Sequence, residues 1–373
     1  MNTTRRTFVK SFLGGAVAVS TLPFLTGCGN ITRKDIQTQN NIIPNENLDA
    51  TLYDILYYAS LAPSGHNAQP WFVKLLDNRN LIIGVEPKRR LPAVDPDNRE
   101  TLLGIGAFLE NLSIAAAVMG FEAQIKIIAK NPLDTEIAKV SLQKSAPVNY
   151  PLSMLTQRTT VRKNLLNKDL KEKDVKELEK YATGNFNYYN RNSEHSKYII
   201  DAQIETYRVQ AYRKDAMEEL KHWFRLNNTD AEKYRDGLTL AGMGISGFPG
   251  WYIRNFMNNN DMVSESSLKI STDMNEAVVK EGAGWIVITS DSSGVSDIVD
   301  AGRKFEKIAL AAMDKNIAIA PMMQILEEKK GKELFKTHHK TELIPQFILR
   351  VGYLDKYPEP VSLRRPVNWF IRK

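Results

Sequence analysis

Two long helical segments of similar composition constrain the fold of this chain more than any other feature. Apolar residues recur at helical spacing over residues 99–119 and again over residues 296–315. At one fixed offset the two segments match at Gly106/Gly302, Glu110/Glu306, Leu112/Ile308, Ile114/Leu310, Ala115/Ala311 and Ala116/Ala312. Each segment lies between strand-like runs, so the same supersecondary unit is predicted twice. Chance similarity between two alanine-rich helices is the alternative explanation.

The remaining patterns divide the chain into two halves. The first long helix is accompanied by a helix over 48–61 and strands over 71–76, 81–85, 121–128 and 138–142. The second is accompanied by helices over 168–182, 197–226 and 230–241 and strands over 285–289 and 346–353. Residues 144–151 carry two prolines and no periodicity, which predicts a linker. We therefore predict an α+β fold in which residues 48–143 and 152–373 are fused halves that form a pseudo-dimer around the long helices.

Composition allows a large core and argues against several classes of protein. Of 373 residues, 43% are apolar and 25% charged, which excludes disorder, collagen and a membrane bundle. The net charge is +7, and three of these charges, at Arg5, Arg6 and Lys10, lie in the first few residues. The remaining net charge is too small, and the basic residues are too evenly mixed with acidic ones, to predict nucleic-acid binding. An anionic small ligand is compatible with this charge. The single cysteine, Cys28, excludes disulfides, thiol catalysis and a cysteine metal cage.

Residues 1–28 have the pattern of an export signal. A basic start is followed by a stretch rich in Gly, Ala, Val and Leu over residues 11–25 and by small residues before Cys28. The string Thr4-Arg5-Arg6-Thr7-Phe8-Val9-Lys10 resembles a twin-arginine signal, and Leu25-Thr26-Gly27-Cys28 resembles a bacterial lipobox. These resemblances imply a folded, cofactor-loaded lipoprotein, acylated at Cys28 and held at the outer or periplasmic face of a membrane. A buried helix or an uncleaved anchor over residues 11–25 is the alternative.

Residues 29–47 are polar and rich in Asn, Gln, Thr and Lys. This composition is typical of a flexible tether. We expect the segment to connect the lipid to the folded body.

The most specific string of the chain is Pro63-Ser64-Gly65-His66-Asn67-Ala68-Gln69-Pro70-Trp71. It strongly resembles the PSxxNxQPW signature of the FMN-dependent nitroreductase family. A turn whose Asn and Ser merely cap the backbone is the alternative. The resemblance implies that Pro63, Ser64, Gly65 and Asn67 contact the flavin. His66 is expected to touch flavin or substrate, or to stabilise the loop.

A second string, Arg158-Thr159-Thr160-Val161-Arg162, resembles the RRSxR element of the same family. The resemblance implies that Arg158 and Thr160 bind the FMN phosphate and Arg162 binds the pyrimidine edge of the ring. An arginine fork suits a phosphate and keeps its charge at every relevant pH. Thr159 stands where the family often has a second arginine, so that contact is in doubt.

A third string, Leu363-Arg364-Arg365-Pro366, follows the last predicted strand, where nitroreductase chains return a basic residue to the phosphate. We favour Arg365, with Arg364 as the second choice; a solvated basic tail is the alternative. In the family dimer the loop and the arginines come from different subunits, and here they lie in different halves. One complete site is therefore expected, an asymmetry that resembles the single-chain, Acg-like branch of the fold.

After the second long helix, the backbone of Pro321, Met322, Met323 and Gln324 is implied by the same resemblance to donate amides to the flavin ring. The Glu-Gly pair of some members is absent there, and a plain core role for the methionines is the alternative. The segment 242–251, rich in Gly and aromatic residues, predicts either a lid or a packed loop. His338-His339 is too isolated to predict a metal site, and we expect no metal.

The resemblance implies a monomeric oxidoreductase that passes two electrons through FMN to a nitroaromatic, a quinone or a similar flat acceptor. The electron donor is open, because an exported protein would not meet NAD(P)H at useful concentration, and we expect slow turnover with it. Storage or sequestration of FMN under a cover is the second hypothesis. A lipoprotein adaptor without flavin is the third, and it requires all three motifs to be coincidental.

Overall fold

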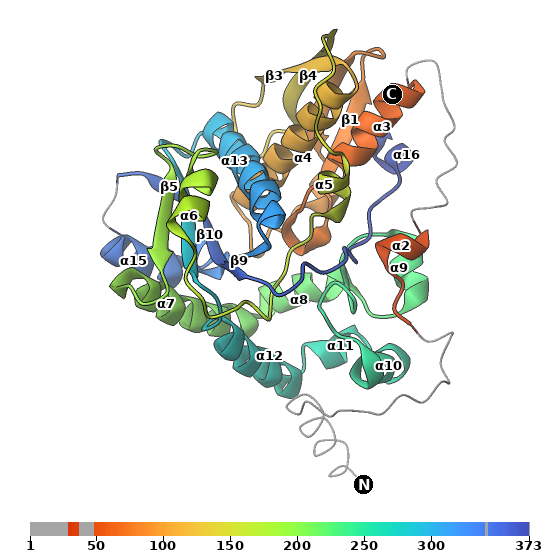
Figure 1. The fold of residues 1–373 in the computed structure, drawn as a ribbon. Helices are drawn as coiled ribbons and strands as arrows, with labels where there is room; N and C mark the ends of the chain where they lie inside the picture. Colours follow the sequence, from red (N-terminus) through yellow and green to blue (C-terminus); the bar gives the residue numbers. More distant parts are fainter. Residues whose placement is uncertain (1–28, 37–47, 340–341, 373) are drawn as a thin grey trace.

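A computed structural model describes residues 29–36, 48–339 and 342–372. The predicted export signal with Cys28, and residues 37–47 of the predicted tether, lie outside the described residues. Two long helices, α4 (Arg99–Val118) and α13 (Val295–Asp314), pack against each other at the centre of the molecule (Figure 1). They confirm the two helical segments predicted from periodicity, and their ends agree to within one residue.

The crossing of α4 and α13 is pseudo-symmetric. A Cβ atom built on Gly106 would lie 2.1 Å from the carbonyl oxygen of Val299, and one built on Gly302 would lie 2.1 Å from that of Leu103. Each glycine thus meets the residue three positions before the other glycine, which is the reciprocal contact expected of a two-fold axis. Only glycine permits this approach, so the matched pair Gly106/Gly302 has a physical reason.

The sheet of the first half contains β1 (Trp71–Leu75), β2 (Asn80–Val85), β3 (Phe121–Ile127) and β4 (Glu136–Lys144), with β11 (Ile371–Arg372) at its edge, in the order β11-β1-β2-β4-β3. The first four strands are antiparallel, and α3 (Ala50–Ala59) packs on α4. The short β11 comes from the end of the chain and pairs parallel to β1. The second half therefore adds a strand to the sheet of the first.

The sheet of the second half is antiparallel, in the order β5-β8-β10-β9. Its strands are β5 (Phe186–Asn190), β8 (Gly284–Ser290), β9 (Ile317–Pro321) and β10 (Ile344–Tyr353). Every residue of β8 is buried, because β5 and β10 flank it and α13 covers it. Periodicity did not predict β5 or β9, which are five residues long each. Residues 145–151, within the predicted linker, carry no helix or strand.

Most further helices of the second half surround its sheet or extend below it in Figure 1, whereas the last one, α16 (Val367–Phe370), packs on α3 and β1 of the first half. The others are α5 (Ser153–Gln157), α6 (Glu172–Glu179), α7 (Glu194–Ala211), α8 (Lys214–Trp223), α9 (Asn228–Tyr234), α10 (Gly247–Phe256), α11 (Asn259–Met262), α12 (Glu265–Val278), α14 (Gln324–Glu327) and α15 (Lys329–His338). Short strands β6 (Phe224–Arg225) and β7 (Leu238–Thr239) pair between α8 and α10.

Two predicted helices differ from the structure. The helix expected over 197–226 is broken into α7 and α8 near Tyr212 and Arg213. The helix expected over 230–241 ends at Tyr234, because Arg235 and Gly237 have φ angles of 50° and 71°. Left-handed residues end a helix. Part of the predicted loop 242–251 is helical, since α10 begins at Gly247.

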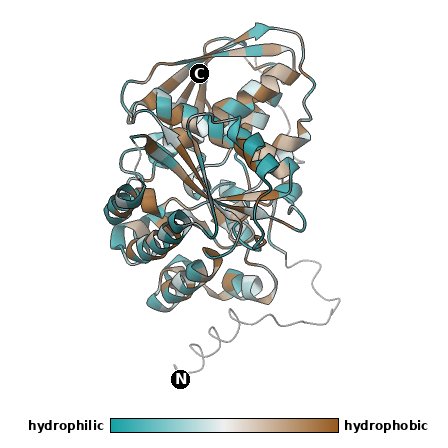
Figure 2. Ribbon diagram, turned by 60° about the vertical axis from the view of Figure 1, so that its left-hand side comes forward, coloured by the Kyte–Doolittle hydropathy of each residue, from teal (hydrophilic) through white to brown (hydrophobic). Residues whose placement is uncertain are grey.

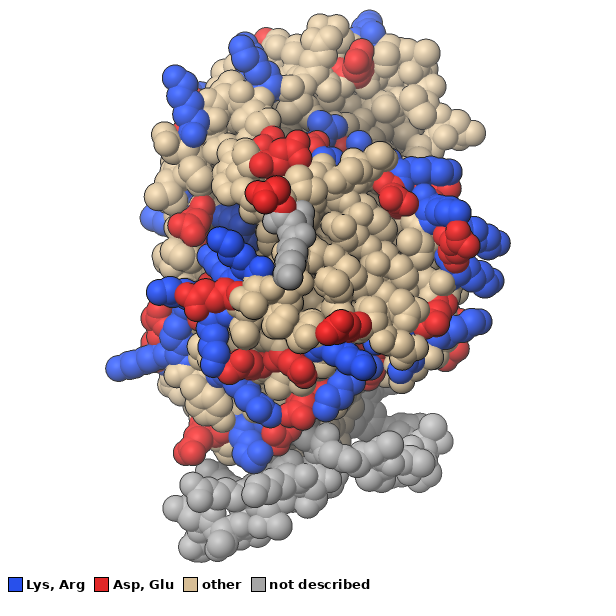
Figure 3. Space-filling view, turned by 90° about the vertical axis from the view of Figure 1, so that its left-hand side faces the viewer, with Lys and Arg blue, Asp and Glu red and all other residues tan. Residues whose placement is uncertain are grey.

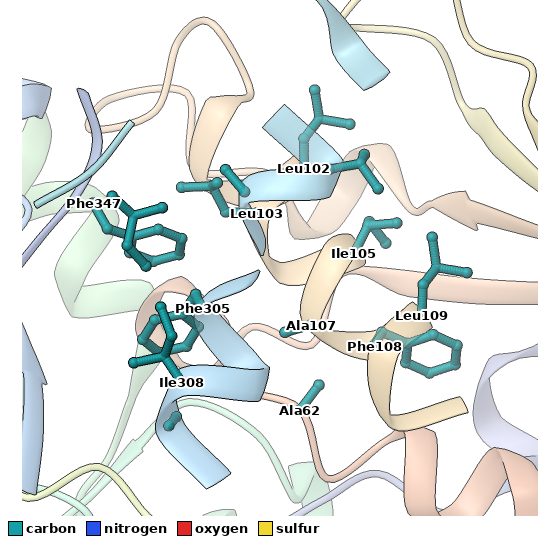
Figure 4. Close-up of a cluster of buried hydrophobic side chains, with 14 of the residues drawn as sticks. Ala62, Leu102, Leu103, Ile105, Ala107, Phe108, Leu109, Phe305, Ile308 and Phe347 are labelled. Carbon is teal, nitrogen blue, oxygen red and sulfur yellow. The ribbon is translucent and has the colours of Figure 1, made fainter. Parts of the chain in front are cut away.

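The core is continuous between the two halves. In Figure 4 Ile105 and Phe108 of α4 point to one side of the helix crossing and Phe305 and Ile308 of α13 to the other, and Phe305 stacks on Phe347 of β10 with ring centroids 4.4 Å apart. Figure 2 shows brown, apolar strands and inner helix faces, and teal outer faces on the peripheral helices. Helix α4 is long and apolar enough to cross a membrane, but 78% of its most apolar window is buried inside the protein, as expected of a core helix.

The first described segment corrects part of the predicted tether. Residues 29–36 are bound to the body, and their short helix α2 (Arg33–Ile36) buries Arg33 and Ile36. Ile36 packs against Ala231 and Leu363. Two apolar residues, Ile31 and Ile36, anchor a segment whose overall composition is polar, and composition alone hides such isolated anchors.

Charges on the surface are mixed. On the face drawn in Figure 3, Lys and Arg alternate with Asp and Glu and form no concentrated basic area. Among the described residues, no group of three or more His, Cys, Asp and Glu side chains is placed to hold a metal ion.

Candidate functional site

The signature loop between α3 and β1 has an unusual backbone. His66, Asn67 and Gln69 have φ angles of 47°, 51° and 50°, in the left-handed region that non-glycine residues seldom adopt. The hydroxyl of Ser64 accepts a hydrogen bond from the backbone N–H of Gln69 at 2.9 Å and closes the turn. Three such residues within four positions are typical of a loop whose shape serves a site.

Close packing against α4 explains the first three residues of the motif. A Cβ on Gly65 would lie 2.9 Å from the side chain of Leu91 and 3.4 Å from Oε2 of Glu100. Gly104 of α4 faces the carbonyl of Pro63 and the side chain of Ser64. Pro63, Ser64 and Gly65 therefore lie on the N-terminal part of α4, and a larger residue at position 65 would displace the loop.

The amide of Asn67 is engaged by the protein itself. Its Nδ2 donates to the carbonyls of Gly237 and Leu363 at 3.2 and 3.3 Å, and its Oδ1 accepts from Nη1 of Arg364 at 3.0 Å. Gln69 is similarly bound, accepting from the backbone N–H of Arg365 at 2.8 Å. The loop thus ties the first half to the C-terminal segment, and Asn67 acts there as a bridge between the halves.

Three buried arginines gather on the other side of this bridge. Arg33, Arg158 and Arg364 are 6%, 3% and 5% exposed, and Nε of Arg158 lies 3.1 Å from Oε1 of the fully buried Glu306 of α13. Burial and, to a smaller extent, the neighbouring Arg158 lower the pKa of Arg33 to about 10. Burial also lowers the pKa of Arg364, and Arg33 and Arg158 add to this effect. The three guanidinium groups are therefore close enough to repel one another.

This group, which we call the arginine cluster (Arg33, Arg158, Arg364 and Glu306), carries surplus positive charge. One carboxylate faces three guanidinium groups, and burial raises the pKa of Glu306. Buried charges are costly unless they are paired. Carbonyl oxygens compensate in part, since Arg33 donates to Ser362 and Thr156, and Arg364 donates to Leu61. The arrangement suits an anion with about two negative charges.

The structure gives the two C-terminal arginines different surroundings. Arg365 points to β1, where its Nη2 donates to the carbonyls of Gln69 and Trp71 at 2.6 and 2.8 Å. Arg364 instead joins the arginine cluster. Successive side chains of an extended segment point to opposite sides, so one of the two arginines necessarily faces the sheet. The sequence alone does not say which one.

The other end of the RTTVR string reaches the signature loop. The side chain of Arg162 is exposed in part, and burial around its charged end lowers its pKa. It makes no ion pair or side-chain hydrogen bond with the described residues, while its carbonyl accepts from Arg350. Burial, and then the charge of Arg162, lowers the pKa of His66 to about 4, so this histidine is neutral near pH 7. Thr160, half-buried, lies between Arg158 and Arg162 in the chain.

The segment after β9 is largely occupied by protein contacts. The N–H of Met322, which was expected to face the flavin ring, donates to the carbonyl of Ile348 at 2.8 Å. Met322 and Met323 are buried in the core, and Oε1 of Gln324 accepts from Nε2 of Gln203 at 2.7 Å. Of the predicted backbone donors, Met322 is thus already paired, and Pro321 has no N–H.

A buried pair of carboxyl groups was not predicted. Glu100, at the start of α4, and Glu327, at the end of α14, are in hydrogen-bond contact, and burial raises the pKa of both. Nε2 of Gln210 donates to Glu327. This contact favours a proton shared between the two carboxyl groups. No local pattern could have revealed the pair, because its members lie in different halves.

Two other predicted features lie elsewhere. His339 accepts from or donates to the hydroxyl of Tyr189 at 2.8 Å, and His338 stacks on Tyr198, so both belong to the packing of α15 on α7 and β5. In the segment 242–251, the carbonyls of Gly244 and Ile245 accept from Lys163 and Asn30. The segment therefore touches both the chain next to Arg162 and the N-terminal segment.

Sequence relatives identify the group of proteins to which this molecule belongs. A Mycobacterium tuberculosis protein that carries the name of an NAD(P)H nitroreductase, Acg, is 37% identical over 330 residues, which cover 83% of this chain and 92% of the relative. The chain belongs to the nitroreductase family. PigM of Serratia, also named as an NAD(P)H nitroreductase, is 21% identical over 326 residues, 83% of this chain and 89% of PigM. Rv3131 of M. tuberculosis is 30% identical over 97 residues, and the match spans 28% of its length.

Other comparisons are weaker. No protein-family model matches the chain. The FMN-dependent nitroreductase NfnB of Mycobacterium smegmatis, solved with NADPH, is 12% identical with a TM-score of 0.37, over 59% of this chain and 96% of that one. A nitroreductase of Anabaena variabilis is 11% identical with a TM-score of 0.37, over 84% and 90%. Membership of the family rests on the likeness to Acg, and the α+β architecture with paired central helices agrees with it.

Proposed function

We propose that the protein binds one FMN and transfers two electrons through it to a flat organic acceptor. One observation carries this proposal: the buried arginine cluster has surplus positive charge and lies beside the signature loop. A phosphate monoester carries about −1.5 to −2 charges at neutral pH, which matches the surplus. Arginine forks bind phosphate oxygens in pairs, so Arg158 and Arg364 are suited to hold the phosphate.

The residues at the other end fit the ring of FMN. Arg162 is a cation without a protein partner among the described residues, and it stands beside the neutral His66. A fixed cation stabilises negative charge that develops next to it. Bound FMN supplies the hydride chemistry. The protein's part is then to hold the phosphate, to orient the ring and to stabilise its anionic reduced edge through Arg162.

Nitroaromatics and quinones are the acceptors that we propose. The relatives are named for NAD(P)H as electron donor, but the export proposed below would keep this protein from NAD(P)H at useful concentration, so we expect slow turnover with that donor. Glu100 and Glu327 form a proton-holding pair next to Gly65. Acceptors of this kind take up protons together with electrons, and such a pair is a suitable source. Oxidation of NAD(P)H that depends on a quinone or a nitroaromatic tests the turnover; bound FMN without turnover with any donor would favour sequestration instead.

The cofactor proposal is tested by Arg158→Gln with Arg303→Gln as matched control. Arg303 pairs with Glu110, the counterpart of Glu306 in the other half, at 2.9 Å, but it is partly exposed. A hydrogen bond to a charged group contributes about 1.5–3 kcal/mol. We therefore expect Arg158→Gln to weaken FMN binding about tenfold to a hundredfold and Arg303→Gln to leave it unchanged. Equal affinities in both variants would contradict the assignment of the cluster.

We also propose that residues 1–28 export the protein, as a monomeric pseudo-dimer, and that Cys28 carries the lipid that attaches it to a membrane. The basic start and the lipobox-like string support this proposal. The mass of the N-terminal peptide from the producing cell tests it. An unmodified Met1 at the N-terminus would contradict it.

A further inference from the structure

We propose that Arg33, on the N-terminal segment 29–36, is a third arginine for the phosphate of FMN, and that docking of this segment completes the cofactor site. The inference rests on the proposed function. It adds a residue from outside the two halves, in a part of the chain that the sequence predicted to be a flexible tether. The segment 29–36 is called the N-terminal strap below.

The N-terminal strap is held at both of its sides by other parts of the chain. On one side the backbone N–H of Ile31 donates to Oδ1 of Asn228 at 3.2 Å, and Nδ2 of Asn228 donates to the carbonyl of Gly29 at 2.9 Å. On the other side the backbone N–H of Arg33 donates to the carbonyl of Val361 at 3.3 Å. The strap therefore joins α9 to the C-terminal segment, and Figure 1 shows α2 beside α9.

The side chain of Arg33 leaves the strap and enters the protein. Its Nε donates to the carbonyl of Ser362 at 2.9 Å and its Nη1 to that of Thr156 at 3.1 Å. These two carbonyls belong to the segments that carry Arg364 and Arg158. The guanidinium is thus fixed between the two other arginines of the cluster, and its Nη2 has no partner among the described residues.

Charge gives the reason for a third arginine. Arg158 and Arg364 against Glu306 leave a surplus of one positive charge, and Arg33 raises it to two. A cluster of like charges that lies buried without an anion repels itself and is poorly solvated. The dianion of a phosphate monoester would satisfy both charges, whereas a neutral ligand would satisfy neither. Arg33 should therefore favour FMN over riboflavin, which lacks the phosphate.

The ratio of the affinities for FMN and riboflavin tests this inference. It is measured by quenching of flavin fluorescence on the full chain, in the wild type, in Arg33→Gln and in Lys34→Gln. Lys34 is the exposed neighbour of Arg33 on the same helix and provides the control for a lost surface charge. We expect Arg33→Gln to weaken FMN binding at least about tenfold, as for other hydrogen bonds to charged groups, and to leave riboflavin binding unchanged. Lys34→Gln should change neither.

A second variant tests the docking of the strap apart from the charge of Arg33. Asn228→Ala removes the two hydrogen bonds that the Asn228 side chain makes with the strap and keeps all three arginines. We expect a smaller loss of FMN affinity, again without a change for riboflavin. If each of the variants Arg33→Gln and Asn228→Ala lowers the affinities for FMN and for riboflavin by the same factor, or lowers only thermal stability, Arg33 is a structural residue and the inference is wrong. If the wild type does not distinguish FMN from riboflavin, the proposed function itself fails.

Discussion

At the scale of single residues, the site separates side chains that the protein itself occupies from side chains left for a ligand. Asn67 and Arg365 were expected to contact the cofactor, but hydrogen bonds between the halves engage both of them. Arg162 has no such partner among the described residues. The residue types of a motif therefore do not by themselves tell which side chains are left for a ligand.

His66 gives a prediction for the dependence of stability on pH. Burial, and then Arg162, lowers its pKa from 6.5 to about 4. Between these values the unfolded chain binds more protons than the folded one, so stability rises with pH across this window. His66→Asn removes the titration and keeps a side chain that tolerates a positive φ.

We expect the free energy of unfolding of His66→Asn, relative to the wild type, to be higher at pH 5 than at pH 8. The difference should be on the order of 1 kcal/mol after allowance for partial solvent access. Urea denaturation at both pH values measures it. The same difference in the free energy of unfolding between variant and wild type at pH 5 and pH 8 would show that His66 titrates normally in the folded protein.

At the scale of elements, the crossing of α4 and α13 is the main packing contact between the two halves. Gly302 lies against the backbone of Leu103, and neither helix can move away without disturbing the core around Phe305 and Phe108. Glu306, on the same face of α13, reaches the arginine cluster. The distance between the two helices and the position of the site are therefore linked.

Gly302→Ala tests this contact, with Gly104→Ala of α4 as the control. The new Cβ at position 302 would lie 2.1 Å from a carbonyl oxygen, while at position 104 the nearest atom is 3.4 Å away. We expect Gly302→Ala to lose about 1–3 kcal/mol of stability through overpacking. Gly104→Ala should gain up to about 1 kcal/mol from helix propensity. Thermal unfolding compares the two, and a stable Gly302→Ala protein would show a looser crossing.

At the scale of the whole molecule, the sequence predicted the repeated long helices and missed the features that depend on contacts between distant segments. The long helices carry strong periodicity and a matched glycine pair, so their existence and contact were predictable. Strands β5 and β9 are short, and the hydrogen bonds that define them come from distant residues of β8 and β10. Arg33, the Glu100–Glu327 pair and the orientation of Arg364 depend on contacts between segments far apart in the chain. Local patterns hold no information on such contacts.

The proposal of one FMN per chain depends most on the asymmetry of the two halves. Glu306 faces buried arginines, whereas its counterpart Glu110 faces Arg303 and Lys307, which are partly exposed. We therefore propose a phosphate site at Glu306 and its arginines and none at Glu110. The flavin released from gently purified protein, identified by chromatography and counted against polypeptide, is the most direct test. We predict FMN at a ratio near one per chain; a ratio near two, a different flavin, or none after reconstitution with excess FMN would contradict the account.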